Sequence, residues 1–164
     1  MTADAAKNTV GATDTLLSIL ETVQEFDGAR VSEIADELTV SKSTVHRHLK
    51  TLENREYVAR EGDEYVIGLR FLDVGEYVKS RKKAYVMAES KVKELAEETN
   101  ERAQFIVEEH GKAVYVHREI GERAVHTDPG VGKRIPLHAT AAGKAIMAHL
   151  PDERVDDLLE TRGL

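Results

Sequence analysis

Two short segments in the first third of the chain carry apolar residues at helical spacing. In the first segment, Ile34, Ala35 and Leu38 share one face. Ser32 offers an N-capping hydroxyl just before that face, and Val31 is placed to act as a hydrophobic staple. We therefore predict a short helix that begins at Ser32.

The second segment follows after a turn at residues 39–40. Ser41 is again a good N-cap, and Val45, Leu49 and Leu52 form an inward stripe at helical spacing. The opposite face carries hydroxyls, an amide, imidazole and cations, which suit DNA base edges and phosphates. The outward and flanking side chains are Lys42, Ser43, Thr44, His46, Arg47, Lys50, Thr51 and Asn54, with Glu53 off to one side.

A β-hairpin is predicted directly after this helix. Apolar-rich runs at 57–60 and 65–67 are separated by Glu61-Gly62-Asp63-Glu64, which is a turn signal. Taken alone, the preceding helix would more often be an ordinary amphipathic helix with a solvated polar face. Helix, turn, capped helix and hairpin in this order instead predict a winged helix-turn-helix, which places its second helix in a DNA major groove. The predicted DNA contacts are Lys42, Ser43, Thr44, His46, Arg47, Lys50 and, from the wing, Arg60.

These residues carry a family resemblance. The stretch VSEIADELTVSKSTVHRHLKTLENREYV is similar to the pattern ITEIA…STVHRxLxTLxxxGYV that is common in IclR-type transcription regulators. Thr39 and Glu56 stand where that family usually has glycines, in the helix–helix turn and before the wing. The resemblance implies a sequence-specific regulator that is controlled by a small organic effector. It also implies a homodimer or tetramer on a palindromic operator in double-stranded DNA.

Helices are predicted on both sides of the winged helix-turn-helix. Residues 14–26 carry an apolar stripe after Thr13, a candidate cap, and residues 69–80 and 84–98 also have helical patterns. The resemblance assigns dimer contacts to the first of these helices and a subunit-pairing linker helix to residues 69–83. The predicted domains are a DNA-binding domain at 1–68, that linker helix at 69–83 and an effector-binding domain at 84–164.

The second half changes to a strand pattern. Strands are predicted at 104–108, 113–118 and 124–126, then a loop, a helix over 137–150 and another helix from Pro151. The whole chain is therefore predicted to be α+β, with a three-helix winged helix-turn-helix, a linker helix and an incomplete GAF-like α/β effector domain. Because the chains of the similar family are longer, we expect the sensor half to be incomplete here, as in a fragment.

A second resemblance lies in GKRIPLHATAAGKAIMAHL, residues 132–150. It is similar to the IclR run of a basic residue, Pro-Leu-His, two small residues and Gly-Lys before an apolar helix. The resemblance implies that the backbone amides of Ala141 and Ala142 meet an effector carboxylate, with His138 and Thr140 nearby. Exposed amides at a helix start do bind anions. Close packing of small residues explains the same pattern equally well.

Charge does not by itself indicate DNA binding. The formal net charge is -7, and the half with the predicted helix-turn-helix is the more acidic one. The cations of that half are nevertheless concentrated on the predicted recognition helix and wing. Both a halophilic surface and a moderately acidic mesophilic surface fit this composition.

Several function classes are disfavoured by the composition and motifs. The chain has no cysteine, which excludes disulfides, thiolate catalysis and cysteine-ligated zinc. The Gly-Lys pairs at 132–133 and 143–144 lack the other residues of a phosphate-binding loop. No catalytic triad or carboxylate pair can be specified, so we predict neither an enzyme nor a cofactor. His117, His126 and His138 could meet at a metal, but ordinary half-buried histidines are more common, and no metal is predicted.

No run of residues is long and apolar enough to span a membrane, and the first residues do not resemble a secretory signal. We therefore expect a cytoplasmic protein without a membrane partner. Besides a ligand-controlled regulator, one alternative stays open: a winged-helix module for dimerisation or protein interaction that does not bind an operator independently. The sequence also leaves open whether the regulator represses or activates.

Overall fold

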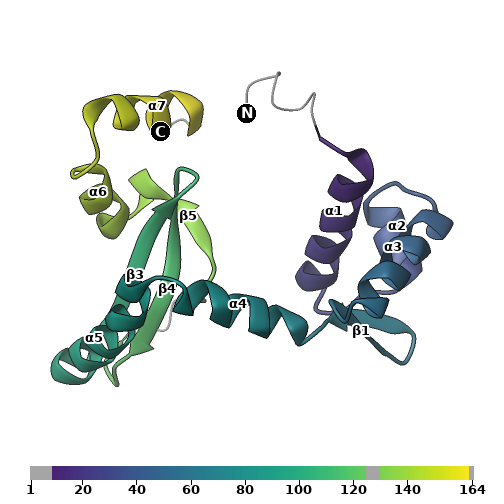
Figure 1. Ribbon diagram of the computed structural model, residues 1–164, viewed down its shortest axis with the longest axis horizontal. Coiled ribbons are helices and arrows are strands. Elements are labelled where there is room, and N and C mark those ends of the chain that lie inside the picture. The colour runs from purple at the N-terminus through teal and green to yellow at the C-terminus, as the bar shows by residue number, and fades with distance from the viewer. Residues whose placement is uncertain (1–8, 125–129, 163–164) are drawn as a thin grey trace. The chain divides into compact units, whose positions relative to one another are not determined.

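The computed structural model describes residues 9–124 and 130–162. The chain forms two compact units, of which the first ends at Tyr77 and the second begins at Val78 (Figure 1). Helices dominate the first unit, and the second contains helices around a small antiparallel sheet, so the predicted α+β class is confirmed. The three-part division at residues 68 and 83 stays a prediction.

The first unit has the element order predicted for a winged helix-turn-helix. The β-hairpin is antiparallel, with Val58 opposite Ile67, and an isolated bridge joins Ala29 to Tyr65. The bridge and the first strand thus lie on opposite sides of the second strand. The elements are α1 (Gly11–Glu25), α2 (Val31–Glu37), α3 (Lys42–Asn54), β1 (Val58–Glu61), β2 (Glu64–Ile67) and the start of α4 (Arg70–Ser80).

One apolar core holds these elements together. The predicted inward stripe of α3 is confirmed, since Val45, Leu49 and Leu52 are buried. Ile19 of α1 and Ile34 of α2 are fully buried against the same cluster. Burial stabilises by roughly 1.5–3 kcal/mol for each large aliphatic side chain, which fixes the rotation of α3 about its own axis.

The first two helices begin at other residues than predicted. α1 begins at Gly11 after Val10, which makes no side-chain capping bond, so the predicted cap at Thr13 is wrong. α2 begins at Val31 rather than Ser32, and its Glu33 carboxylate accepts the N–H of Arg30 at 2.7 Å. Capping preferences identify suitable side chains, but they do not decide which residue first adopts helical dihedrals.

α1, α2 and α3 end alike, each followed by a non-glycine residue in the left-handed conformation. These residues are Asp27 (φ 55°), Thr39 (φ 54°) and Glu56 (φ 64°). After the last two, the N–H groups of Val40 and Tyr57 bond back to carbonyls of their helices at 3.1 and 2.9 Å. This is the Schellman arrangement, in which the left-handed position is usually glycine. The backbone therefore keeps the glycine conformation at both positions where the sequence has lost the glycine.

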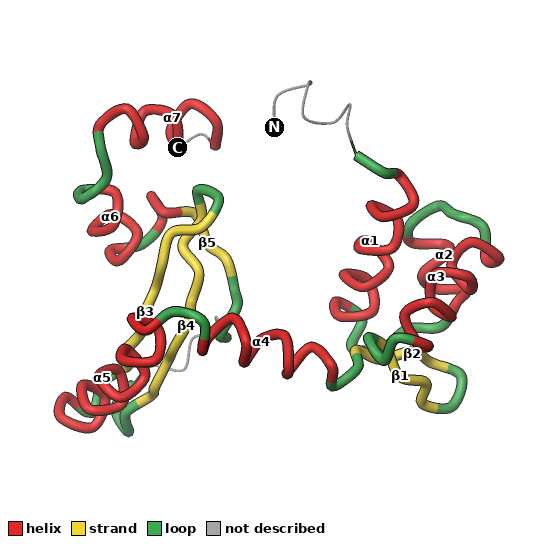
Figure 2. Tube along the Cα trace, in the orientation of Figure 1, coloured by secondary structure: helices red, strands yellow, loops and turns green. Residues whose placement is uncertain are grey.

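The second unit is built on a sheet with the order β3-β4-β5 (Figure 2). α5 packs on β3 through Val92 and Ala96, which join Phe105 in one apolar cluster. The next residue of β3, Ile106, belongs to a second cluster with Ala113, Leu137 and Leu158. Since neighbouring strand residues point to opposite faces, the two clusters lie on opposite faces of the sheet. The elements are α5 (Lys83–Thr99), β3 (Arg102–Glu109), β4 (Lys112–Ile120), β5 (Arg134–Pro136), the short 3-10 helix η2 (Leu137–Ala139), α6 (Ala141–Met147) and α7 (Asp152–Arg162).

Three predictions for this unit are not confirmed. β5 lies in the predicted loop, because a three-residue strand shows no alternation and is fixed by its pairing with residues 112–114. The predicted continuous helix over 137–150 is wrong, because an extended Thr140 (φ -131°) separates η2 from α6. In the predicted strand 124–126, Ala124 lies outside any strand, and the other two residues lie outside the described residues.

The left-handed positions yield a stability prediction. Thr39→Gly and Glu56→Gly should each stabilise the protein by about 1 kcal/mol, because glycine adopts positive φ without the steric cost that a β-carbon brings. Urea unfolding followed by circular dichroism measures the change. Glu21→Gly, at an exposed position inside α1, is the control and should destabilise by roughly 1 kcal/mol. Destabilisation by the first two variants would show that the motif does not strain these residues.

Candidate nucleic-acid interface

Ser41 organises the start of α3. Its Oγ accepts the backbone N–H of Thr44 at 3.1 Å, so the predicted N-cap is confirmed. The same oxygen lies 2.9 Å from the Ser43 hydroxyl and 2.8 Å from the Thr44 hydroxyl. The cap therefore fixes both hydroxyls at the helix N-terminus, where the dipole and the first amides favour an anion such as phosphate.

The remaining polar side chains of α3 lie opposite its buried stripe. Lys42, Ser43, His46, Arg47 and Lys50 are exposed, and Thr44 is half-buried. The six predicted α3 residues thus lie outside the buried stripe of this helix. Their assignment to DNA contacts is tested only by binding experiments.

Lys50 pairs with an acidic residue that is not among the predicted site residues. Its Nζ donates to Oε2 of Glu53 at 2.9 Å. This hydrogen bond is the largest cause that raises the pKa of Lys50, and it is also the largest cause that lowers the pKa of Glu53. The i,i+3 spacing of the two residues is the sequence signal that could have indicated the pair.

The wing contains a hydrogen-bonded turn and forms ion pairs with the start of α2. Arg60 of β1 is exposed, and its Nε donates to the carbonyl of Gly62 at 3.0 Å in the turn. Gly62 has φ 66° at the first central position of this two-residue turn, which is where a type II′ turn needs glycine. Arg30, at the start of α2, lies 2.8 Å from Asp63 and 3.3 Å from Glu64. Sequence reasoning missed Arg30, because only the fold brings it to the hairpin.

The predicted effector residues lie around the break before α6. Ala141 and Ala142 are the exposed first residues of α6, and Oγ1 of Thr140 accepts the N–H of Gly143 at 3.0 Å. Gly143 is buried, and a β-carbon there would lie 2.0 Å from the carbonyl oxygen of Leu137. The small residue is therefore required by the close approach of η2, which supports the packing interpretation at this one position.

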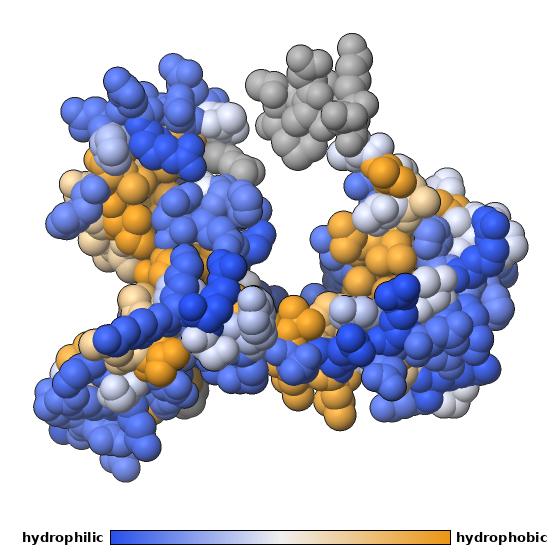
Figure 3. All heavy atoms as spheres, in the orientation of Figure 1, coloured by the Kyte–Doolittle hydropathy of each residue, from blue (hydrophilic) through white to orange (hydrophobic). Residues whose placement is uncertain are grey.

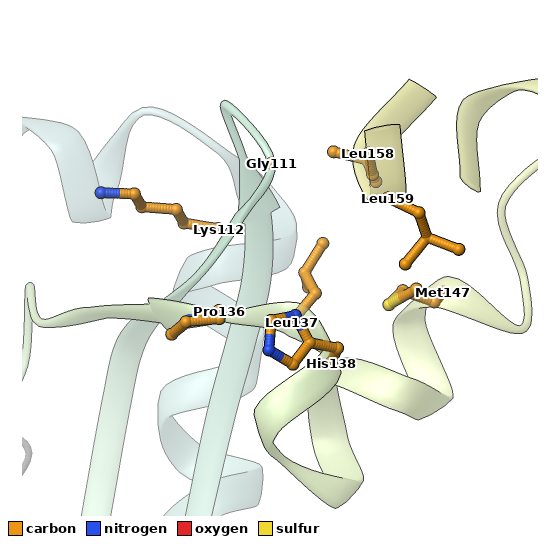
Figure 4. A pocket seen from close by; sticks show the side chains of 8 residues that line it. All are labelled: Gly111, Lys112, Pro136, Leu137, His138, Met147, Leu158 and Leu159. Atoms are coloured by element: carbon orange, nitrogen blue, oxygen red, sulfur yellow. The ribbon is translucent and has the colours of Figure 1, made fainter. Parts of the chain in front are cut away.

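His138 lies at a pocket of about 200 Å³ beside η2 (Figure 4). The Nζ of Lys112 points away from the apolar side chains at its centre. Thr140, Ala141 and Ala142 are not among the lining residues, so this pocket contains His138 without the other three predicted effector residues. The lining residues are Gly111, Lys112, Pro136, Leu137, His138, Met147, Leu158 and Leu159.

The histidines do not form a metal centre in the described part of the chain. His117 is 6% exposed, its ring lies 6.4 Å from that of Phe105, and its Nε2 has no hydrogen-bond partner among the described residues. No group of three possible ligands comes together within residues 9–124 and 130–162. His126 lies outside the described residues.

α4 presents apolar side chains to solvent (Figure 3). Leu72 and Tyr77 are 66% and 67% exposed, and the structure shows no buried residue in this described helix. At its start, Phe71 packs edge-on against Tyr57 at 5.1 Å between ring centroids. Exposed apolar side chains of this kind are typical of a surface that contacts another chain. None of the described helices combines the length and apolar character needed to cross a bilayer.

Comparisons with known proteins agree with this architecture. The family model of the IclR helix-turn-helix domain matches residues 12–62, and that of the bacterial transcriptional regulator IclR C-terminal domain matches residues 77–164. The probable HTH-type transcriptional regulator ArcR of Halobacterium salinarum is 29% identical over 147 residues, which cover 87% of this chain and 56% of that protein. The chain thus spans about half the length of the curated relatives it matches.

Solved structures show the same fold. The crystal structure of Pseudomonas aeruginosa HmgR is 26% identical with a TM-score of 0.76, and the match covers 93% of this chain and 67% of that one. An IclR homologue from Microbacterium hydrocarbonoxydans, complexed with 4-hydroxybenzoate, is 21% identical with a TM-score of 0.71. That match covers 88% of this chain and 63% of the other, and it shows similarity of fold alone.

Two cations at the edges of the interface yield a binding prediction. Lys42→Ala and Arg60→Ala should each weaken the binding of all duplexes alike, because phosphate contacts carry no sequence information. Each loss should reduce the slope of log affinity against log salt by about one unit. Anisotropy titrations of several duplexes over a salt series measure both effects. A loss confined to one sequence would show that the side chain contacts bases.

Proposed function

We propose that this chain, which belongs to the IclR family of transcription regulators, binds DNA sequence-specifically and responds to a small organic effector. The observation that carries the proposal is the geometry of α3. Its capped N-terminus, buried stripe and exposed polar face form a recognition helix, followed at once by a wing.

We propose Arg47 as the principal base-reading side chain. It is exposed opposite the buried Val45 and Leu49, near the middle of the outward face of α3. An arginine in the major groove can donate two hydrogen bonds to guanine. Lys42 and Arg60 flank this position along the chain and serve as phosphate contacts, with Ser43, Thr44, His46 and Lys50 completing the interface.

We propose that the protein acts as a homodimer or a tetramer. Val74 and Val78, which share one face of α4 at i,i+4 spacing and are 41% and 44% exposed, mark the surface through which subunits pair. Pairing would set two copies of α3 in successive major grooves of a palindromic operator. A cytoplasmic location follows from this function.

We propose a small carboxylate as the effector. The first amides of a helix have no partner within the helix, and in α6 those amides belong to Ala141 and Ala142. The Thr140 hydroxyl and the His138 imidazole lie close in sequence to this helix start. The 4-hydroxybenzoate bound by the Microbacterium homologue is a ligand of the same chemical class.

The DNA-binding proposal is tested through Arg47. The wild-type protein should select a preferred duplex from a random pool, and Arg47→Ala should lose roughly 1–3 kcal/mol of discrimination against other sequences. Arg123→Ala, an exposed arginine of the second unit, is the control and should keep full discrimination. Circular dichroism checks the fold. Undiminished discrimination by a folded Arg47→Ala protein would overturn the base-reading role, and a wild type without any selected duplex would favour an interaction module.

The effector proposal is tested at Ala142. Ala142→Leu should abolish or strongly weaken effector binding, because added bulk blocks the approach to the backbone amides, whereas operator binding should survive. Calorimetric titration with a panel of small carboxylates measures this in a protein that contains the whole effector domain. Ala145→Leu, at an exposed position of the same helix, is the matched control. Equal binding by Ala142→Leu and wild type would assign this segment to packing alone.

A further inference from the structure

Glu53 lies among the cations that we propose as DNA contacts. It accepts the hydrogen bond of Lys50 at 2.9 Å, and its side chain is 29% exposed. The charge of Arg60 in the wing also lowers the pKa of this carboxyl group, after the larger effect of the Lys50 hydrogen bond. One carboxylate therefore lies near proposed DNA-binding side chains from two elements.

Three other acids near the wing pair with arginines. Glu56 lies 3.7 Å from Arg70, while Asp63 and Glu64 pair with Arg30. Neither arginine is a proposed DNA contact. The carboxylate of Glu53 differs from these acids because its partner, Lys50, is needed by DNA phosphate.

We propose that Glu53 occupies the place of a DNA phosphate in the free protein and thereby opposes sequence-independent binding. The inference rests on the proposed DNA-binding function. A phosphate that binds Lys50 must first displace the carboxylate of Glu53, which then remains nearby as an unfavourable negative charge. Binding to arbitrary sequences depends on phosphate contacts alone and is driven by counterion release. An internal counterion removes part of that driving force, since a Lys50 paired with Glu53 neutralises less phosphate charge and fewer cations leave the DNA.

Such a counterion has a functional consequence. A genome offers a very large excess of non-specific sites, which compete with the operator for free protein. By neutralising Lys50 until a phosphate replaces it, Glu53 limits how much protein is held on arbitrary DNA. Arg47, which we propose reads bases, is exposed and is not part of this pair. It therefore retains its contribution to the affinity for the operator.

The test compares Glu53→Gln with Glu94→Gln in the full protein. Both substitutions remove one negative charge and break an i,i+3 pair with lysine, because Glu94 pairs with Lys91 on α5. Each variant is titrated against a mixed-sequence duplex over a salt series, and thermal unfolding checks that it is folded. Glu53→Gln should bind roughly tenfold more tightly than wild type at low salt, and its log–log salt slope should be steeper by about 0.9. Glu94→Gln should match wild type.

A second comparison, in protein that lacks the charge of Lys50, tests whether Lys50 is the cation that Glu53→Gln makes available to phosphate. In Lys50→Gln protein, the further change Glu53→Gln should steepen the salt slope much less than it does in wild type. An unchanged slope and affinity for Glu53→Gln would overturn the inference while leaving the DNA-binding function intact. Weaker binding would also overturn it, because Glu53 would then contribute to the complex, for example by accepting from a cytosine amino group. If neither wild type nor Glu53→Gln binds any duplex, the proposed function fails as well.

Discussion

The first unit depends on the burial of one apolar stripe of α3. Val45 and Leu49 are fully buried between α1 and α2, against Ile19 and Ile34. Because a helix repeats every 3.6 residues, fixing this stripe also fixes which side chains face outward. The polar face with Arg47 and Lys50 is exposed as a consequence of that packing. The core, and not contacts among the interface side chains, thus decides which side chains of α3 face outward.

The ends of the helices show the same dominance of packing over local preference. Asp27, Thr39 and Glu56 hold left-handed conformations that glycine adopts more easily. Each position follows a helix whose buried side chains are already fixed in the core, and the Schellman hydrogen bonds satisfy the last carbonyls. The surrounding structure therefore over-determines the conformation and maintains it at a local cost.

Charged side chains around the wing form individual ion pairs, so the net charge of the chain does not indicate which cations are available to phosphate. The chain carries a net charge of -7, yet the arginine and lysine side chains around the wing have distinct partners. Arg30 pairs with Asp63 of the hairpin, Arg70 pairs with Glu56, and Lys50 pairs with Glu53. Such exposed pairs contribute little to stability, but they decide which cations are available to an approaching phosphate.

The sequence by itself determined the features that depend on neighbours within one or two helical turns. The periodicity at Val45, Leu49 and Leu52 and the cap at Ser41 are local signals, and so is the turn at Gly62. With the resemblance of residues 31–58, they were sufficient for the winged helix-turn-helix and for the family. The apolar pattern of residues 69–80 likewise predicted α4 within one residue of its start.

Only the tertiary structure decided the features that depend on residues brought together by folding. β5 exists because residues 134–136 pair with β4, and no alternation in three residues could indicate it. The approach of Leu137 to Gly143 shows why that glycine is required, and the break at Thr140 separates His138 from the first turn of α6. The pairing of Arg30 with Asp63 is likewise non-local. Local propensities are small free energies, and burial and pairing in the folded chain outweigh them where the two conflict.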